Sequence, residues 1–239
     1  AIGLKAEGIS LANMKAVGYT VKELKSAGFT AAELHDVNFK AHELTSAGFT
    51  AKELKEGGYS TAEELHQAGC IVSELKEGGF GARELKKGGY TATELIVGGF
   101  LPRELKDGGF TAMELKNTVS AGELKAAGFT VLALKASGFT ASELKDVGLA
   151  AKDLYAKGNG FAPLELKMVG FGAKQLRAAG MTVDQLTAIG VGLEDLKHAG
   201  YRAGQLREAA FDAKELEAVG FSVSDHCRTI KAFVEKLPV

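Results

Sequence analysis

The fold is decided by the decapeptide at residues 20–29, which reads TVKELKSAGF and is followed at residues 30–39 by TAAELHDVNF. The same phrase returns about every ten residues along most of the chain. A short fixed period is typical of repeat proteins, in which each unit packs on its neighbours instead of around one central core. The period therefore predicts one elongated repeat domain.

Leucine holds one slot of nearly every repeat, as at Leu24 and Leu34, and Met14 replaces it once. Five residues later comes a large apolar residue, usually Phe or Tyr, with glycine before it. The spacing of the leucines departs from ten at three places, which lie between Leu54 and Leu65, Leu115 and Leu124, and Leu154 and Leu166.

Each decapeptide begins with the pattern of a helix N-terminus. In a capping box the Thr20 hydroxyl accepts from the Glu23 N–H, and the Glu23 carboxylate accepts from the Thr20 N–H. The pairs with this spacing are Thr20/Glu23, Thr30/Glu33, Thr50/Glu53, Thr61/Glu64, Thr91/Glu94, Thr111/Glu114, Ser120/Glu123 and Thr140/Glu143. Glycine then supplies the left-handed residue that ends a helix. Pro102 and Pro163 both fall at the first helical position, where proline is well tolerated.

These signals predict an all-α fold, an α-solenoid or superhelix of about 22 short two-turn helices, one per repeat. Helices this short are unstable alone, so they must stack through their leucine face. A β-helix is the alternative, because large apolar residues recur every five positions. It would bury charged residues such as Lys22 and Arg83, which is prohibitive.

We expect a single domain over 1–239, with a degenerate N-terminal cap at 1–18 and the repeats at 19–221. An amphipathic capping helix is predicted at 222–239, because its apolar residues have helical spacing. Those residues are Ile230, Phe233, Val234 and Leu237.

Composition excludes some classes. The net charge is −1, 25% of residues are charged, and no stretch of about 18 apolar residues predicts a membrane span. No secretory signal is visible. Cys70 is interpreted as buried packing, and with Cys227 it is expected to be a free thiol, so a cytoplasmic location is favoured.

No catalytic pattern stands apart from the repeat. The five histidines occupy slots that hold Lys, Ala or Glu elsewhere, and we interpret them as surface residues. The Gly-Gly pairs follow helices and are therefore helix stops, not phosphate loops. We expect no enzyme activity, no cofactor, no metal site and no small-molecule substrate.

Glutamate precedes the repeat leucine and lysine follows it, which predicts two ladders in which a lysine lies near the glutamate of a neighbouring unit. The lysine row could form a nucleic-acid track, but the glutamate row balances its charge, so no nucleic acid is expected. A threonine row that binds ice or mineral is also disfavoured, because the threonines are needed as helix caps.

Recognition is therefore expected at the slots that vary. Exposed apolar residues gather at 96–113, and we predict a partner contact there through Ile96, Val97, Leu101 and Met113. The function favoured is a scaffold for protein–protein interaction, and the alternative is a spacer or filler subunit of a larger assembly.

The phrase Gly-Phe-Thr-Ala-x-Glu-Leu-Lys-x-Ala resembles that of tandem decapeptide repeat proteins, over Leu4 to about Phe221. The resemblance implies an interaction or structural solenoid and brings no catalytic residues with it.

Overall fold

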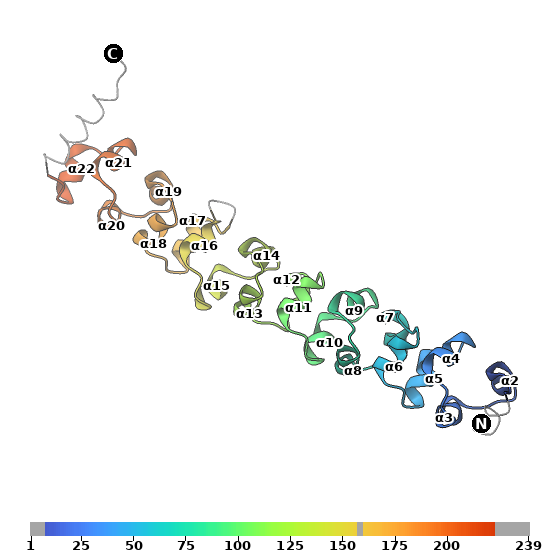
Figure 1. The fold of residues 1–239 in the computed structure, drawn as a ribbon. Coiled ribbons are helices and arrows are strands. Elements are labelled where there is room, and N and C mark those ends of the chain that lie inside the picture. Colours follow the sequence, from blue (N-terminus) through green and yellow to red (C-terminus); the bar gives the residue numbers. More distant parts are fainter. Residues whose placement is uncertain (1–7, 157–159, 223–239) are drawn as a thin grey trace, which may run out of the picture. The chain divides into compact units, whose positions relative to one another are not determined.

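The computed structural model describes residues 8–156 and 160–222, and these residues form only helices, turns and loops (Figure 1). The all-α prediction is confirmed, with 21 short helices in this described part of the chain, and the β-helix alternative is wrong. The capping helix predicted at 222–239 lies outside the described residues apart from Ser222. Across the described helices, none has the length and apolar character that crossing a bilayer requires.

The chain divides into two compact units, Ala1–Phe129 and Thr130–Val239. The helices of the first unit are α2 Leu11–Ala16, α3 Val21–Ser26, α4 Ala31–Asp36, α5 Ala41–Ser46, α6 Ala51–Glu56, α7 Ala62–Gln67, α8 Val72–Glu77, α9 Ala82–Lys87, α10 Ala92–Val97, α11 Pro102–Asp107, α12 Ala112–Leu115 and α13 Ala121–Ala126. Those of the second are α14 Val131–Ala136, α15 Ala141–Asp146, α16 Ala151–Tyr155, α17 Pro163–Met168, α18 Ala173–Ala178, α19 Val183–Ala188, α20 Leu193–His198, α21 Ala203–Glu208 and α22 Ala213–Ala218.

The helix starts follow the predicted capping boxes, with one exception. Thr50 Oγ1 accepts from the Glu53 N–H at 3.2 Å, and the Glu53 carboxylate accepts from the Thr50 N–H at 2.7 Å. The prediction for Thr61 is wrong, because that hydroxyl makes no cap. Ser60 is the extra residue of this repeat, and the Glu64 carboxylate accepts from the Ala41 N–H instead. Both prolines stand at the first helical turn as predicted.

Every described helix except α12 is followed by a left-handed residue, which is usually glycine. Gly28 has φ of +80°, and its N–H donates to the Lys25 carbonyl. The Phe29 N–H donates to the Leu24 carbonyl. This pair of bonds is the Schellman motif, which turns the chain sharply and drives the aromatic residue back toward its own helix.

For most helices of the first unit, and for α16 and α18 of the second, the main packing partner is a helix two repeats away, not the next one as simple neighbour stacking predicts. In the first unit these contacts run unbroken from α3·α5 to α11·α13, and in the second they include α16·α18 and α18·α20. Tyrosines report the same interval, because the Tyr59 hydroxyl donates to the Phe39 carbonyl and the Tyr90 hydroxyl to that of Cys70, each 20 residues back. One layer of the stack therefore takes two repeats.

Close approach between these helices requires a glycine at the first position of the Gly-Gly pairs. Gly88 follows α9 with φ of −78°, so its backbone needs no left-handed conformation. A Cβ atom there would lie 2.3 Å from the carbonyl carbon of Ala62, the first residue of α7. The second glycine of such a pair has the left-handed conformation that ends the helix, as Gly89 does with φ of +90°. The first glycine has the different role of making room for the helix two repeats back.

Gly88→Ala should lower the free energy of unfolding by about 1–3 kcal/mol, because the added methyl group meets backbone that cannot move aside. Chemical denaturation followed by circular dichroism measures this loss. Gly172→Ala is the control, since a Cβ atom there meets nothing within 4 Å; its cost should be limited to a weaker N-cap, at most about 1 kcal/mol. Equal stability of the Gly88 variant and the parent protein would contradict the packing described.

Candidate protein-binding surface

The four residues predicted to contact a partner differ in exposure. Val97 is 82% exposed, Met113 64% and Leu101 63%, whereas Ile96 is half-buried. Ile96 occupies the slot of the repeat lysines, and this slot faces the neighbouring layer. Val97 ends α10, Met113 lies in α12, which packs against α10, and Leu101 is the N-cap of α11. Three of the four are therefore available on the surface of the first unit.

The structure adds Ile71, which is 57% exposed at the N-cap of α8. Ile71 and Val97 line the same cavity of about 550 Å³ between α8 and α10. We call Ile71 and Val97 the apolar patch. The sequence signal for Ile71 was an apolar residue in the slot of the capping threonines. In the second unit, Leu164 and Met168 are exposed one helical turn apart on α17, a spacing that also could have been noticed.

The lysine that follows the repeat leucine is bound within the stack. The Lys86 ammonium donates to the Gly109 carbonyl at 2.7 Å and to the Glu114 carboxylate at 2.9 Å. It also lies 4.5 Å from the centroid of the Phe110 ring. Lys86 thus joins its own helix to the end of α11 and the start of α12. The carbonyls at a helix C-terminus carry partial negative charge, which favours a cation there.

The same arrangement recurs along both units. The lysine–glutamate contacts predicted from the two ladders are confirmed, but each lysine reaches the capping glutamate three repeats further on. The ion pairs of this kind are Lys25–Glu53, Lys55–Glu84, Lys76–Glu104, Lys86–Glu114 and Lys135–Glu165. Each of these lysines except Lys135 also lies over a phenylalanine ring 24 or 25 residues further on, as Lys86 does over Phe110, and Lys135 lies over Phe161.

Two histidines belong to this row, which differs from their interpretation as plain surface residues. The His35 ring packs edge-on against the Tyr59 ring at 4.8 Å between centroids, and His66 lies 4.4 Å from Tyr90. Lysine is thus paired with phenylalanine, and tyrosine with histidine. Arg177 over Tyr201 is the further variant.

Hydrogen bonds at the helix starts lower the pKa of several capping carboxylates and so favour their charged form. The pKa of Glu104 is lowered because its carboxylate accepts from the Leu101 N–H and from the Lys76 ammonium. For Glu94 the Thr91 hydroxyl is the main cause of a lowered pKa. These glutamates are acceptors in the capping network and are not poised as general acids.

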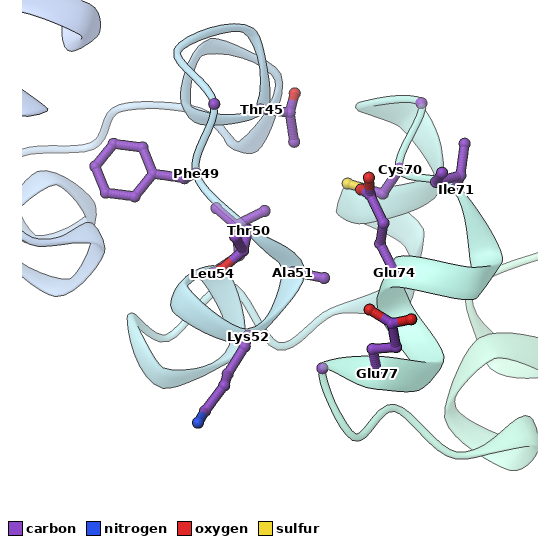
Figure 2. Close-up of a pocket in the computed structure, with 13 residues that line it drawn as sticks. Thr45, Phe49, Thr50, Ala51, Lys52, Leu54, Cys70, Ile71, Glu74 and Glu77 are labelled. Carbon is purple, nitrogen blue, oxygen red and sulfur yellow. The ribbon is translucent and has the colours of Figure 1, made fainter.

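One position of the row lacks both large side chains. The lysine slot holds Thr45 and the aromatic slot holds Cys70, and a cavity of about 630 Å³ lies there between α6 and α8 (Figure 2). Cys70 is half-buried beside this cavity rather than packed in the core as predicted. Burial, and then the nearby Glu74 carboxylate, raise the pKa of the Cys70 thiol to about 11, so the thiol stays protonated.

The described residues contain no group of three or more His, Cys, Asp or Glu side chains that could hold a metal ion. His226 and Cys227 lie outside the described residues.

Lys86→Met keeps the apolar stem but removes the ammonium. We expect a loss of about 1–2 kcal/mol in the free energy of unfolding, because Lys86 is partly exposed and water weakens its contacts. Lys87→Met is the matched control, since Lys87 is exposed on the same helix; its effect should stay within about 0.5 kcal/mol. Equal losses from the two variants in urea denaturation would show that the Lys86 contacts do not stabilise the stack.

The family model of the decapeptide repeat region matches this chain over residues 1–70, 48–119, 118–191 and 160–228. No curated protein matches the chain. The matched segments follow one another along nearly the whole sequence, and their ten-residue unit is the helix, Schellman turn and lysine–aromatic pair described above. The chain therefore belongs to the decapeptide repeat family.

Proposed function

We propose that this chain is a non-enzymatic repeat scaffold that binds other proteins through its variable slots. The observation that carries the proposal is the apolar patch. Val97 and Ile71 are largely exposed, yet they line one cavity on the surface of the first unit. Exposed apolar side chains that share a surface hollow are typical of protein-binding sites.

The repeated residues support the proposal by elimination. The leucines and most aromatic residues are buried, most of the threonines and glutamates cap helices, and most of the lysines bind carbonyl oxygens of the next layer. Each repeated side chain is thus committed to the fold. A ligand would have to be recognised by the residues that change from one repeat to the next.

We further infer that neither nucleic acid nor a small-molecule substrate is the partner. The repeat lysines already donate to carbonyls and carboxylates, as at Lys76 and Lys86, so a phosphate would have to displace those acceptors. The protonated Cys70 thiol is a poor nucleophile. A spacer role within a larger assembly is the second candidate, favoured by the same commitment of the repeated residues to stacking.

The test is quantitative affinity purification from cells that make the protein, with the parent chain and the double variant Val97→Asp/Met113→Asp as baits. We expect the variant to recover at least about tenfold less of the bound partner, since charge at a central apolar contact is strongly unfavourable. Ser26→Asp/Ser46→Asp is the matched control, because it adds the same charge to exposed residues in the slot that Val97 occupies.

The control variant should recover the partner as the parent does, and circular dichroism should show that both variants are folded. Undiminished recovery by the Val97/Met113 variant would contradict a contact at this surface. A parent bait that recovers no partner in stoichiometric amount would contradict the scaffold function and favour the spacer.

A further inference from the structure

The stack contains a repeated binding site for an ammonium group, which its own lysines fill. At five of these lysines, a carbonyl oxygen at a helix end and the carboxylate of the following capping glutamate both face the ammonium: Lys25, Lys55, Lys76, Lys86 and Lys135. Lys55 donates to the Gly79 carbonyl and lies 3.7 Å from the Glu84 carboxylate. The site is therefore defined by its two oxygen acceptors and by the apolar wall along the lysine stem.

The cavity between α6 and α8 has the same two acceptors but no lysine. By position in the repeat, Gly69 and Glu74 correspond to Gly79 and Glu84, and both line the cavity. Thr45 stands in the lysine slot, and its hydroxyl donates to the His42 carbonyl within its own helix.

The Gly69 carbonyl and the Glu74 carboxylate also lack the side-chain donors that these positions have in other repeats. Ile71 is the N-cap of α8 and has no hydroxyl with which to bind Glu74, and no side-chain cap is made. Among the described residues, no side chain donates a hydrogen bond to the Gly69 carbonyl or pairs with the Glu74 carboxylate. An ammonium group at this place would satisfy both.

The walls of the cavity suit an aliphatic stem. Phe49 and the exposed Ile71 contribute apolar surface, and Cys70 leaves the space that an aromatic ring fills in the adjoining repeats. The one lysine on the lining, Lys52, points away from the cavity in Figure 2 and lies 3.9 Å from Glu56 of its own helix. Within residues 8–156 and 160–222, no cation therefore pairs with Glu74.

We propose that this cavity binds the side chain of a lysine that a partner protein contributes. The proposal rests on the scaffold function and assigns it a second contact, which adjoins the apolar patch and shares Ile71 with it. Lysine is favoured over arginine because the side chains of the row that meet both a helix-end carbonyl and a capping carboxylate are lysines, as at Lys55 and Lys76, whereas Arg177 meets a carbonyl alone. The partner's lysine would replace the internal one that this repeat lacks.

The probe is Nα-acetyl-lysine amide, added to the full-length, ¹⁵N-labelled chain, with amide shifts followed by NMR. We expect saturable shifts centred on Gly69, Cys70 and Glu74, with a dissociation constant of about 1–10 mM, as suits so small a ligand. The neutral isostere Nα-acetyl-norleucine amide should produce no saturable shift. Equal binding of the norleucine compound, or tighter binding of Nα-acetyl-arginine amide, would overturn the assignment.

Two variants sharpen the test. Glu74→Gln should weaken the lysine probe at least about fivefold, because one charged acceptor is lost. Thr45→Lys should abolish its binding and raise the unfolding temperature, because the internal ammonium then fills the site. Ser46→Lys is the matched control, which adds the same charge on exposed surface one residue away and should leave probe binding intact.

Unchanged probe binding by Thr45→Lys would overturn the proposal. The result is separable from the scaffold function, because the probe needs no partner protein. If the chain recovers a partner through Val97 and Met113 but does not bind the probe, the scaffold function is supported and the lysine site is refuted. If the chain binds the probe but recovers no partner, the lysine site is supported and the scaffold function is refuted.

Discussion

A six-residue helix has almost no stability of its own, and this constraint governs the rest of the structure. Nucleating a helix fixes several residues for the first hydrogen bond, so a two-turn helix persists only when other chain segments hold it. For most helices of the first unit the contact that holds the helix is the one with the helix two repeats further on. Leucine fills that interface, and glycine at positions such as Gly88 lets the backbones approach.

In many repeats the lysine that follows the leucine, such as Lys86, adds a second contact at the side of the stack. Its ammonium reaches the carbonyl that ends a helix two repeats on and the carboxylate that caps the helix after it. One side chain therefore ties together three helices that are separated in sequence. It follows that a regular row of lysines on a helical repeat need not be a charged surface for ligands. Ligand binding is instead expected where another residue replaces the lysine, as at Thr45, and where apolar residues are exposed, as at Val97.

Much of the repeat could be predicted from sequence because its signals are local. The capping boxes, the glycine stops and the prolines at 102 and 163 each depend on residues within one decapeptide. The packing interval could not be predicted in the same way, because a ten-residue period is equally compatible with stacking on the first or the second neighbour. Thr61 failed as a cap because the added Ser60 changes the path into α7, and the Glu64 carboxylate accepts from a different helix. For the surface, exposure of Val97, Leu101 and Met113 could be predicted from their slots, whereas the pairing of Ile71 with Val97 across one cavity depends on the two-repeat layer.

The central claim is that a cation slot meets the aromatic slot of the repeat two further on. Nuclear Overhauser contacts from the Tyr90 ring, in a chain with selectively labelled tyrosine, test it most directly. The structure predicts contacts from Tyr90 to the His66 ring, 4.4 Å away between centroids, and to Cys70, whose carbonyl the Tyr90 hydroxyl reaches. Contacts from Tyr90 to residues 75–80 of the adjoining repeat, with none to residues 66–70, would contradict it.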